Sequence, residues 1–117
     1  MNNIGNPDLI RQELEFADRA DELIRDLETY GIKLANAEYN YKRKKSETAL
    51  ALRANGTPAT LIAQVLEGYA GVADLRLQRD IAQSNYDTCR ETINLLKYQI
   101  KITENQLARE WGAVGRE

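Results

Sequence analysis

The sequence predicts an all-α protein, built as a long antiparallel two-helix coiled-coil hairpin with a short helix at the connection. Its 117 residues contain only two prolines and one phenylalanine, whereas helix-favouring Ala, Leu, Glu, Arg and Gln are abundant. Apolar residues recur at alternating steps of three and four along two long stretches, which is the spacing of a coiled-coil seam. Asn, Gly and Pro gather between these stretches and indicate the connection. The whole chain, 1–117, is therefore expected to form one helical-hairpin domain.

The first long helix is predicted over 7–54. Asn6-Pro7-Asp8 is a start signal, because Asn can cap a helix, Pro suits its first turn and Asp favours its positive end. Asn55-Gly56 is a typical terminator. The predicted seam consists of Leu9, Phe16, Ala20, Leu23, Leu27, Tyr30, Leu34, Ala37 and Tyr41, and it weakens at Lys44 and Thr48.

The connection is predicted to contain a short helix over 58–67, which Thr57 caps, followed by a bend at the two glycines of 68–71. The second long helix is predicted over 72–111, with 112–117 as a frayed tail. Its seam consists of Val72, Leu75, Ala82, Tyr86, Cys89, Ile93, Leu96, Ile100, Thr103 and Leu107, with Arg79 as an exception. When the helices fold back on each other, Tyr41 should lie near Ala82 or Tyr86.

More apolar residues are present than the seam uses. On the second long helix a further row lies nearly opposite the seam: Leu77, Ile81, Leu95, Tyr98 and Ile102. On the first, a flanking stripe consists of Ile10, Leu14, Ala17 and Ile24. The short helix, a second molecule or a partner protein could cover these residues. Because the short helix is too small to cover a hairpin of this length, we expect a homodimer, with burial against a partner protein as the main alternative.

The residue types exclude most catalytic chemistry. The chain has no histidine, which removes the commonest general base and metal ligand. Its single cysteine, Cys89, occupies a seam position and is interpreted as a core residue, and no phosphate-binding glycine loop is present. We therefore predict no enzymatic activity, no cofactor and no metal site. A lone cysteine, the lack of a signal peptide at the N-terminus and the short apolar runs together predict a cytoplasmic protein without a membrane span.

Charge is distributed unevenly, although the net charge is only −2. Residues 1–30 carry eight acids and three bases, for a net −5, whereas 33–53 carry six bases and two acids, for a net +4. The candidate contact residues of the basic end are Tyr39, Lys42, Arg43, Lys45 and Arg76. Those of the acidic end are Asp18, Asp21 and Glu22. Clustered bases beside a tyrosine suit nucleic acid or an acidic protein, and spaced carboxylates can imitate DNA or bind a divalent ion. For both ends, a solvated helix face is the simpler interpretation.

Two further segments contribute to a resemblance. They are the turn Asn55-Gly56-Thr57-Pro58-Ala59-Thr60 and the last helix, which contains Lys97-Tyr98-Gln99-Ile100 and Ala108-Arg109-Glu110-Trp111. Together with the Tyr-rich, basic second half of the first helix, they resemble small helical-hairpin proteins of bacteriophage and prophage genomes, over roughly residues 30–112. The resemblance implies an accessory or inhibitory role in the cytoplasm of a bacterial host, and it assigns no site residues.

The sequence thus predicts a non-enzymatic protein-interaction module. Its most concrete version is a phage-encoded modulator or inhibitor of a host nucleic-acid enzyme or defence complex. The alternatives are a nucleic-acid-binding accessory protein in phage recombination or replication, and a structural coiled-coil spacer.

Overall fold

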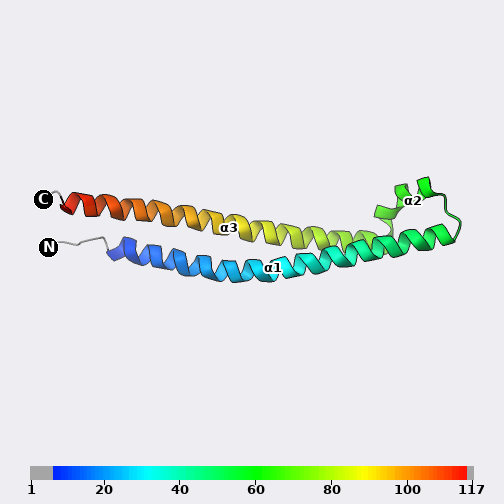
Figure 1. Ribbon diagram of the computed structural model, residues 1–117, viewed down its shortest axis with the longest axis horizontal. Helices are drawn as coiled ribbons and strands as arrows, with labels where there is room; N and C mark the ends of the chain where they lie inside the picture. Colours follow the sequence, from blue (N-terminus) through cyan, green and yellow to red (C-terminus); the bar gives the residue numbers. More distant parts are fainter. Residues whose placement is uncertain (1–6, 116–117) are drawn as a thin grey trace. The chain divides into compact units, whose positions relative to one another are not determined.

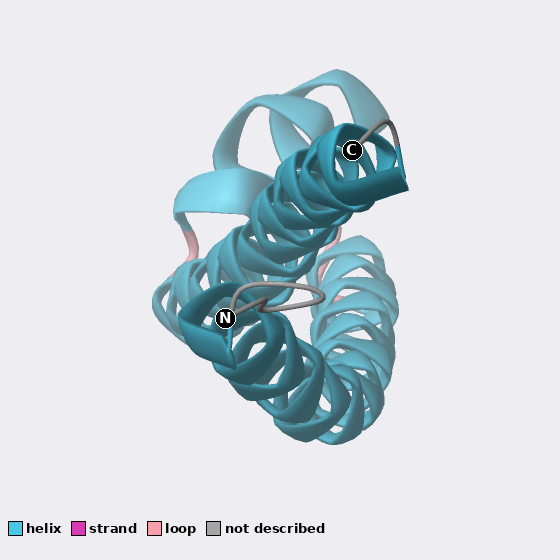
Figure 2. Ribbon diagram, turned by 90° about the vertical axis from the view of Figure 1, so that its left-hand side faces the viewer, coloured by secondary structure: helices cyan, strands magenta, loops and turns pink. Residues whose placement is uncertain are grey.

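The computed structural model describes residues 7–115, and side chains for residues 7–112. It contains α1 (Pro7–Ala54), α2 (Ala59–Val65), the 3₁₀ helix η1 (Leu66–Gly68) and α3 (Ala70–Gly115). The described residues form helices joined by short loops and contain no strand (Figure 2). The predicted all-α class and the pair of long packed helices are confirmed.

The long helix α1 begins and ends where the sequence predicts, although its expected cap, Asn6, lies outside the described residues. Its C-terminus closes through Gly56, whose φ of +87° is a conformation that glycine adopts without strain. The amide of Gly56 donates to the carbonyl of Arg53, and that of Thr57 to the carbonyl of Leu52, both at 3.0 Å. These two bonds are the Schellman pattern, so Gly56 satisfies the last carbonyls of α1 and turns the chain.

The connection differs in detail from the prediction. The short α-helix ends at Val65, and the next three residues tighten into η1. Tyr69 is extended, with φ −64° and ψ 134°, and α3 begins directly after it, two residues earlier than expected. At the other end, α3 continues past Trp111 to Gly115, four residues beyond its predicted end. Residues 116 and 117 lie outside the described part of the chain.

The chain divides into two compact units. The terminal unit holds the chain up to Leu27 and from Thr88 onward, and the connection unit holds Glu28–Asp87. Each unit contains a stretch of α1 packed against a stretch of α3. In the terminal unit the buried residues all occupy predicted seam positions: Ala20, Leu23, Cys89, Ile93, Leu96 and Thr103. The seam prediction is therefore confirmed there.

The connection unit has a core that involves three helical elements. Tyr41 of α1, Leu66 of η1 and the fully buried Val72 of α3 form it, with Ala49 and Leu75 packed against them. Ile62 of α2 is also buried, and α2 lies beside the last turns of α1 (Figure 1, green). The short helix therefore folds back along α1.

Of the two predicted neighbours of Tyr41, Tyr86 is wrong, and Ala82 stays a prediction. The Arg79 guanidinium lies over the Tyr41 ring, 4.6 Å from its centroid. The Tyr86 ring instead packs against Gly31, where an added Cβ would lie 3.5 Å from Tyr86 Cε2. A register that pairs Gly31 with Tyr86 places Tyr41, ten residues later on α1, opposite Arg76, ten residues earlier on α3.

Candidate interaction surfaces

The basic end lies in the connection unit, where α1 carries Tyr39, Lys42 and Arg43 with exposed side chains. Arg43 Nε donates to Glu47 Oε1 at 3.0 Å, one helical turn away. That hydrogen bond is the main reason why the pKa of Arg43 is raised, and Tyr39 adds to the shift. The charge of Arg43 is thus partly balanced within its own helix.

The other two predicted bases converge on an acid from the connection. Lys45 Nζ of α1 lies 2.7 Å from Glu67 Oε1, and Arg76 Nη1 of α3 lies 3.4 Å from Glu67 Oε2. The Tyr41 hydroxyl donates to the same carboxylate, 2.8 Å from each oxygen. Tyr41, Lys45, Glu67 and Arg76 are called the Glu67 clasp below. This clasp ties η1 to both long helices.

The electrostatics of the clasp favour its ionised form. The hydrogen bond from Lys45, and then the one from Tyr41, lowers the pKa of Glu67. The same contact with Glu67 raises the pKa of Lys45. The sequence placed Lys45 and Arg76 in one group, and the structure does bring them together, but around a neutralising acid. The missed signal was Glu67, an acid at the end of a short helix that folds back towards a basic stretch.

The two tyrosines near the basic end have different roles. The side chain of Tyr41 is only 6% exposed, and both Lys45 and Arg79 lie over its ring, at 5.6 and 4.6 Å from the centroid. Tyr39 is 62% exposed, as its place outside the seam predicts. Of these two tyrosines, only Tyr39 presents its ring at the surface.

The acidic end lies on α1 in the terminal unit. Asp18, Asp21 and Glu22 are exposed, and Glu22 accepts a hydrogen bond from Arg19 at 3.0 Å. Among the described residues, no group of three metal-ligating side chains is close enough to hold a metal ion.

Two carboxylates, Glu13 of α1 and Glu104 of α3, interact between the helices of the terminal unit. Burial, followed by hydrogen bonding and charge repulsion between Glu13 and Glu104, raises the pKa of Glu13. Neither residue was predicted to interact, because a sequence does not show which residues of two distant helices face each other.

The predicted apolar row of α3 is exposed along its length. In the connection unit Leu77 is 60% exposed and Ile81 is exposed too, so the short helix does not cover them. In the terminal unit Leu95 is 57% and Tyr98 65% exposed, and Ile102 is also at the surface. These five residues are called the α3 row below. Ile32 and Leu50 of α1, which the sequence analysis did not single out, are exposed as well.

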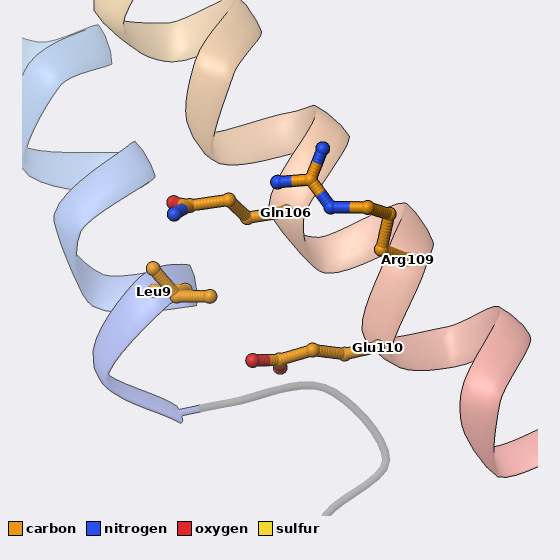
Figure 3. Close-up of a pocket in the computed structure, with 4 residues that line it drawn as sticks. All are labelled: Leu9, Gln106, Arg109 and Glu110. Carbon is orange, nitrogen blue, oxygen red and sulfur yellow. The ribbon is translucent and has the colours of Figure 1, made fainter.

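Three hollows lie on the surface of the described residues. One, of about 300 Å³, lies in the terminal unit, where Leu9 of α1 points towards Gln106, Arg109 and Glu110 of α3 (Figure 3). Two others, of about 330 and 260 Å³, lie in the connection unit beside the last turns of α1.

The thiol of Cys89 is a poor nucleophile, since burial raises its pKa and its Sγ donates to the Leu23 carbonyl at 3.3 Å.

None of the described helices combines the length and the apolar composition that a membrane span needs. Comparison with protein-family models, with curated proteins and with solved structures finds no match to this chain. The resemblance to phage helical-hairpin proteins therefore stays a prediction.

Proposed function

We propose that this protein is a non-enzymatic interaction module that binds another protein through the outer face of α3. The α3 row carries the proposal, because large apolar side chains repeat along it and remain exposed while the seam is filled. Covering these partly exposed side chains is favourable, and about 1.5–3 kcal/mol is the value for burying one of them completely. A row of this kind on a helix suits a groove or a second helix on the partner.

The charged ends contribute less than the sequence suggests. Lys45 and Arg76 are engaged by Glu67, and Arg43 by Glu47, which leaves Tyr39 and Lys42 as the more accessible part of the basic end. The phage resemblance gives the proposal its most concrete version, a modulator of a host nucleic-acid enzyme or defence complex in the bacterial cytoplasm. In that version the α3 row docks on the target, and Tyr39 and Lys42 select it.

The test is affinity capture from host lysate with tagged wild type and two matched variants, with nuclease present throughout. Leu95→Glu places a charge in the α3 row, whereas Asn94→Glu places the same charge on the neighbouring exposed residue outside it. A protein that wild type and Asn94→Glu capture, and Leu95→Glu does not, supports the proposal. Equal capture by all three proteins contradicts it.

A nucleic-acid-binding accessory role is the second candidate, favoured by the exposed Tyr39, Lys42 and Arg43 on one stretch of α1. Phosphate contacts give an affinity that falls steeply with salt. This candidate therefore requires steep salt dependence with single-stranded or duplex DNA, and loss of binding in Lys42→Glu. A flat salt dependence excludes it. A structural spacer, the third alternative, predicts that neither Leu95→Glu nor Lys42→Glu changes any binding.

A further inference from the structure

A surface hollow of the connection unit lies between the last turns of α1 and the short helix α2, which run side by side (Figure 1). Its volume is about 260 Å³. The walls are Ala49, Leu50 and Arg53 of α1 and Ala59 and Ile62 of α2, and the space between these five residues is called the Arg53 hollow below. None of the described residues of α3 lines it, so it is a different surface from the α3 row.

The walls of the hollow are held in place by the packing of the unit. Ile62 is buried, and Ala49 packs against the core around Val72. The Glu67 clasp fastens η1, the element that follows α2, to both long helices. A partner would therefore meet a site that is already formed, and binding does not have to order the walls first.

Apolar surface in the hollow is open to solvent. Leu50 on the α1 wall is 67% exposed, whereas Ile62 on the α2 wall is buried. The volume of the hollow lies below the range of about 300–1,000 Å³ that is usual for small-molecule sites. The hollow therefore suits an apolar side chain of a docked peptide segment better than a whole small molecule.

Arg53 gives the hollow a positive charge that the walls do not balance. The other three arginines of the connection unit each form an ion pair with an acid: Arg43 with Glu47, Arg76 with Glu67 and Arg79 with Asp80. Arg53 has no such partner among the described residues. It is also the only charged residue of the stretch 48–66, which supplies all five wall residues. A carboxylate from another molecule is therefore the natural counter-charge.

The end of α1 does not occupy the Arg53 guanidinium. A base in the last turn of a helix can bind the final carbonyls of that helix. Here the backbone amides of Gly56 and Thr57 donate to the carbonyls of Arg53 and Leu52, both at 3.0 Å. The guanidinium donors are thus available to a carboxylate, which they match in a bidentate geometry.

The other two hollows lack this combination, because an acid lines each of them: Glu110 in the terminal unit and Glu47 in the connection unit. The Arg53 hollow has apolar walls, a base and no acid. A lipid surface matches it less well than a protein does, since attraction to anionic lipids takes a cluster of several bases. The chemistry of the walls points to a protein segment that carries an apolar side chain and a carboxylate close together.

We propose that the Arg53 hollow docks an acidic amphipathic segment of a partner protein. An apolar side chain of that segment lies against Leu50, between α1 and α2, and a neighbouring carboxylate pairs with Arg53. The apolar contact supplies most of the affinity, and the ion pair selects acidic segments over basic ones. This site goes beyond the contact proposed for α3, because it is built from other helices and recognises charge.

The probe is a displayed library of random peptides, selected on the purified full chain and depleted on Leu50→Glu, which places a charge in the hollow. The selection should enrich peptides in which an acid lies beside an apolar residue or one helical turn from it. Fluorescence anisotropy then measures the affinity of an enriched peptide for two further variants. Ala59→Glu charges the opposite wall and should lower the affinity at least about tenfold. Leu61→Glu adds the same charge to α2 at an exposed residue outside the hollow, and it should leave the affinity unchanged.

Charge reversal tests the role of Arg53. Arg53→Glu replaces an attraction by a repulsion, so it should lower the affinity for the enriched peptide about tenfold. It should also bind the same peptide more tightly once the acid of the peptide is replaced by lysine. Lys42→Glu is the matched control, because it changes the net charge equally at an exposed base outside the hollow, and it should keep the wild-type preference. Circular dichroism checks that all variants stay helical.

Three results overturn the proposal. In the first, no peptide is enriched, or the enriched peptides carry no acid. In the second, Ala59→Glu binds as wild type does, or Arg53→Glu and Lys42→Glu show the same preference. In the third, no peptide is enriched while wild type, but not Leu50→Glu, sediments with vesicles of phosphatidylserine and phosphatidylcholine, which would assign the hollow to a membrane surface.

Discussion

The terminal and connection units use the same pair of helices but are stabilised differently. In the terminal unit the buried residues belong to the seam, and the Glu13–Glu104 contact between the helices is repulsive when both carboxylates are ionised. In the connection unit a third element packs on the pair, and the Glu67 clasp adds ion pairs and hydrogen bonds that involve α1, η1 and α3. The difference shows that η1 also stabilises the unit, because it supplies the core residue Leu66 and the carboxylate of Glu67, which forms ion pairs with nearby bases.

The largest expected effect concerns the seam of the terminal unit. Ile93 is buried there, so Ile93→Ala should lower the free energy of unfolding by about 2–5 kcal/mol through lost contacts and a cavity. Leu95, two residues away, is exposed, and Leu95→Ala should change the free energy by less than about 0.5 kcal/mol. Urea denaturation at low protein concentration measures both. Similar effects of the two substitutions would contradict the assignment of the seam.

The next effect concerns the clasp. Tyr41→Phe removes the hydroxyl that donates to Glu67 and keeps the ring, so it should lower the free energy of unfolding by about 1–2 kcal/mol. Tyr39→Phe is the matched control, because the Tyr39 ring lies at the surface, and it should have little effect. Urea denaturation, monitored by circular dichroism, measures the free energy of unfolding of both variants. A clasp that contributes nothing to stability would show no difference between these variants.

The seam and the α3 row are the parts of the structure that the sequence predicts. The seam follows from a spacing rule, and Leu23, Tyr41, Val72 and Ile93 are all buried as expected. The same rule finds the α3 row, because residues opposite a seam must face outward.

The clasp did not follow from the sequence. Its formation depends on how α2 and η1 fold back, and on a register that places the Tyr86 ring against Gly31. Local propensity contains neither piece of information. The basic end was consequently predicted as a free charged surface, although Lys45 and Arg76 both form ion pairs with Glu67.

Mild acid should change the stability of the two units in opposite directions, because the pKa of Glu13 is raised and the pKa of Glu67 is lowered. The pKa of Glu67 is lowered, so its contribution to stability is present above its unfolded value and is lost as pH falls through the folded pKa. The pKa of Glu13 is raised, so its contribution is present below its unfolded value and is lost as pH rises through the folded pKa. Going from neutral pH to below 4.5, the usual value for both, Glu13 protonates first and Glu67 last.

Amide hydrogen exchange, corrected for the intrinsic pH dependence of the exchange rate, should therefore show the terminal unit gaining protection first and the connection unit losing it at lower pH. Glu104→Gln should remove the gain, and Glu67→Gln should remove the loss. Parallel changes in both units would show that acid acts through global charge and not through these two sites.

The smallest expected effect compares two ion pairs of the basic end. Arg43 and Glu47 lie one turn apart on the exposed surface of α1, where side-chain entropy and solvent screening cancel most of the attraction, so Arg43→Ala should leave Tm almost unchanged. Lys45→Ala removes a base that joins α1 to η1 beside the Tyr41 ring, so it should lower Tm by more. Calorimetry of the two variants measures the difference, and raising the salt concentration should reduce it. An equal Tm for both variants would mean that joining separate elements gives the Lys45–Glu67 pair no advantage over a pair within one helix.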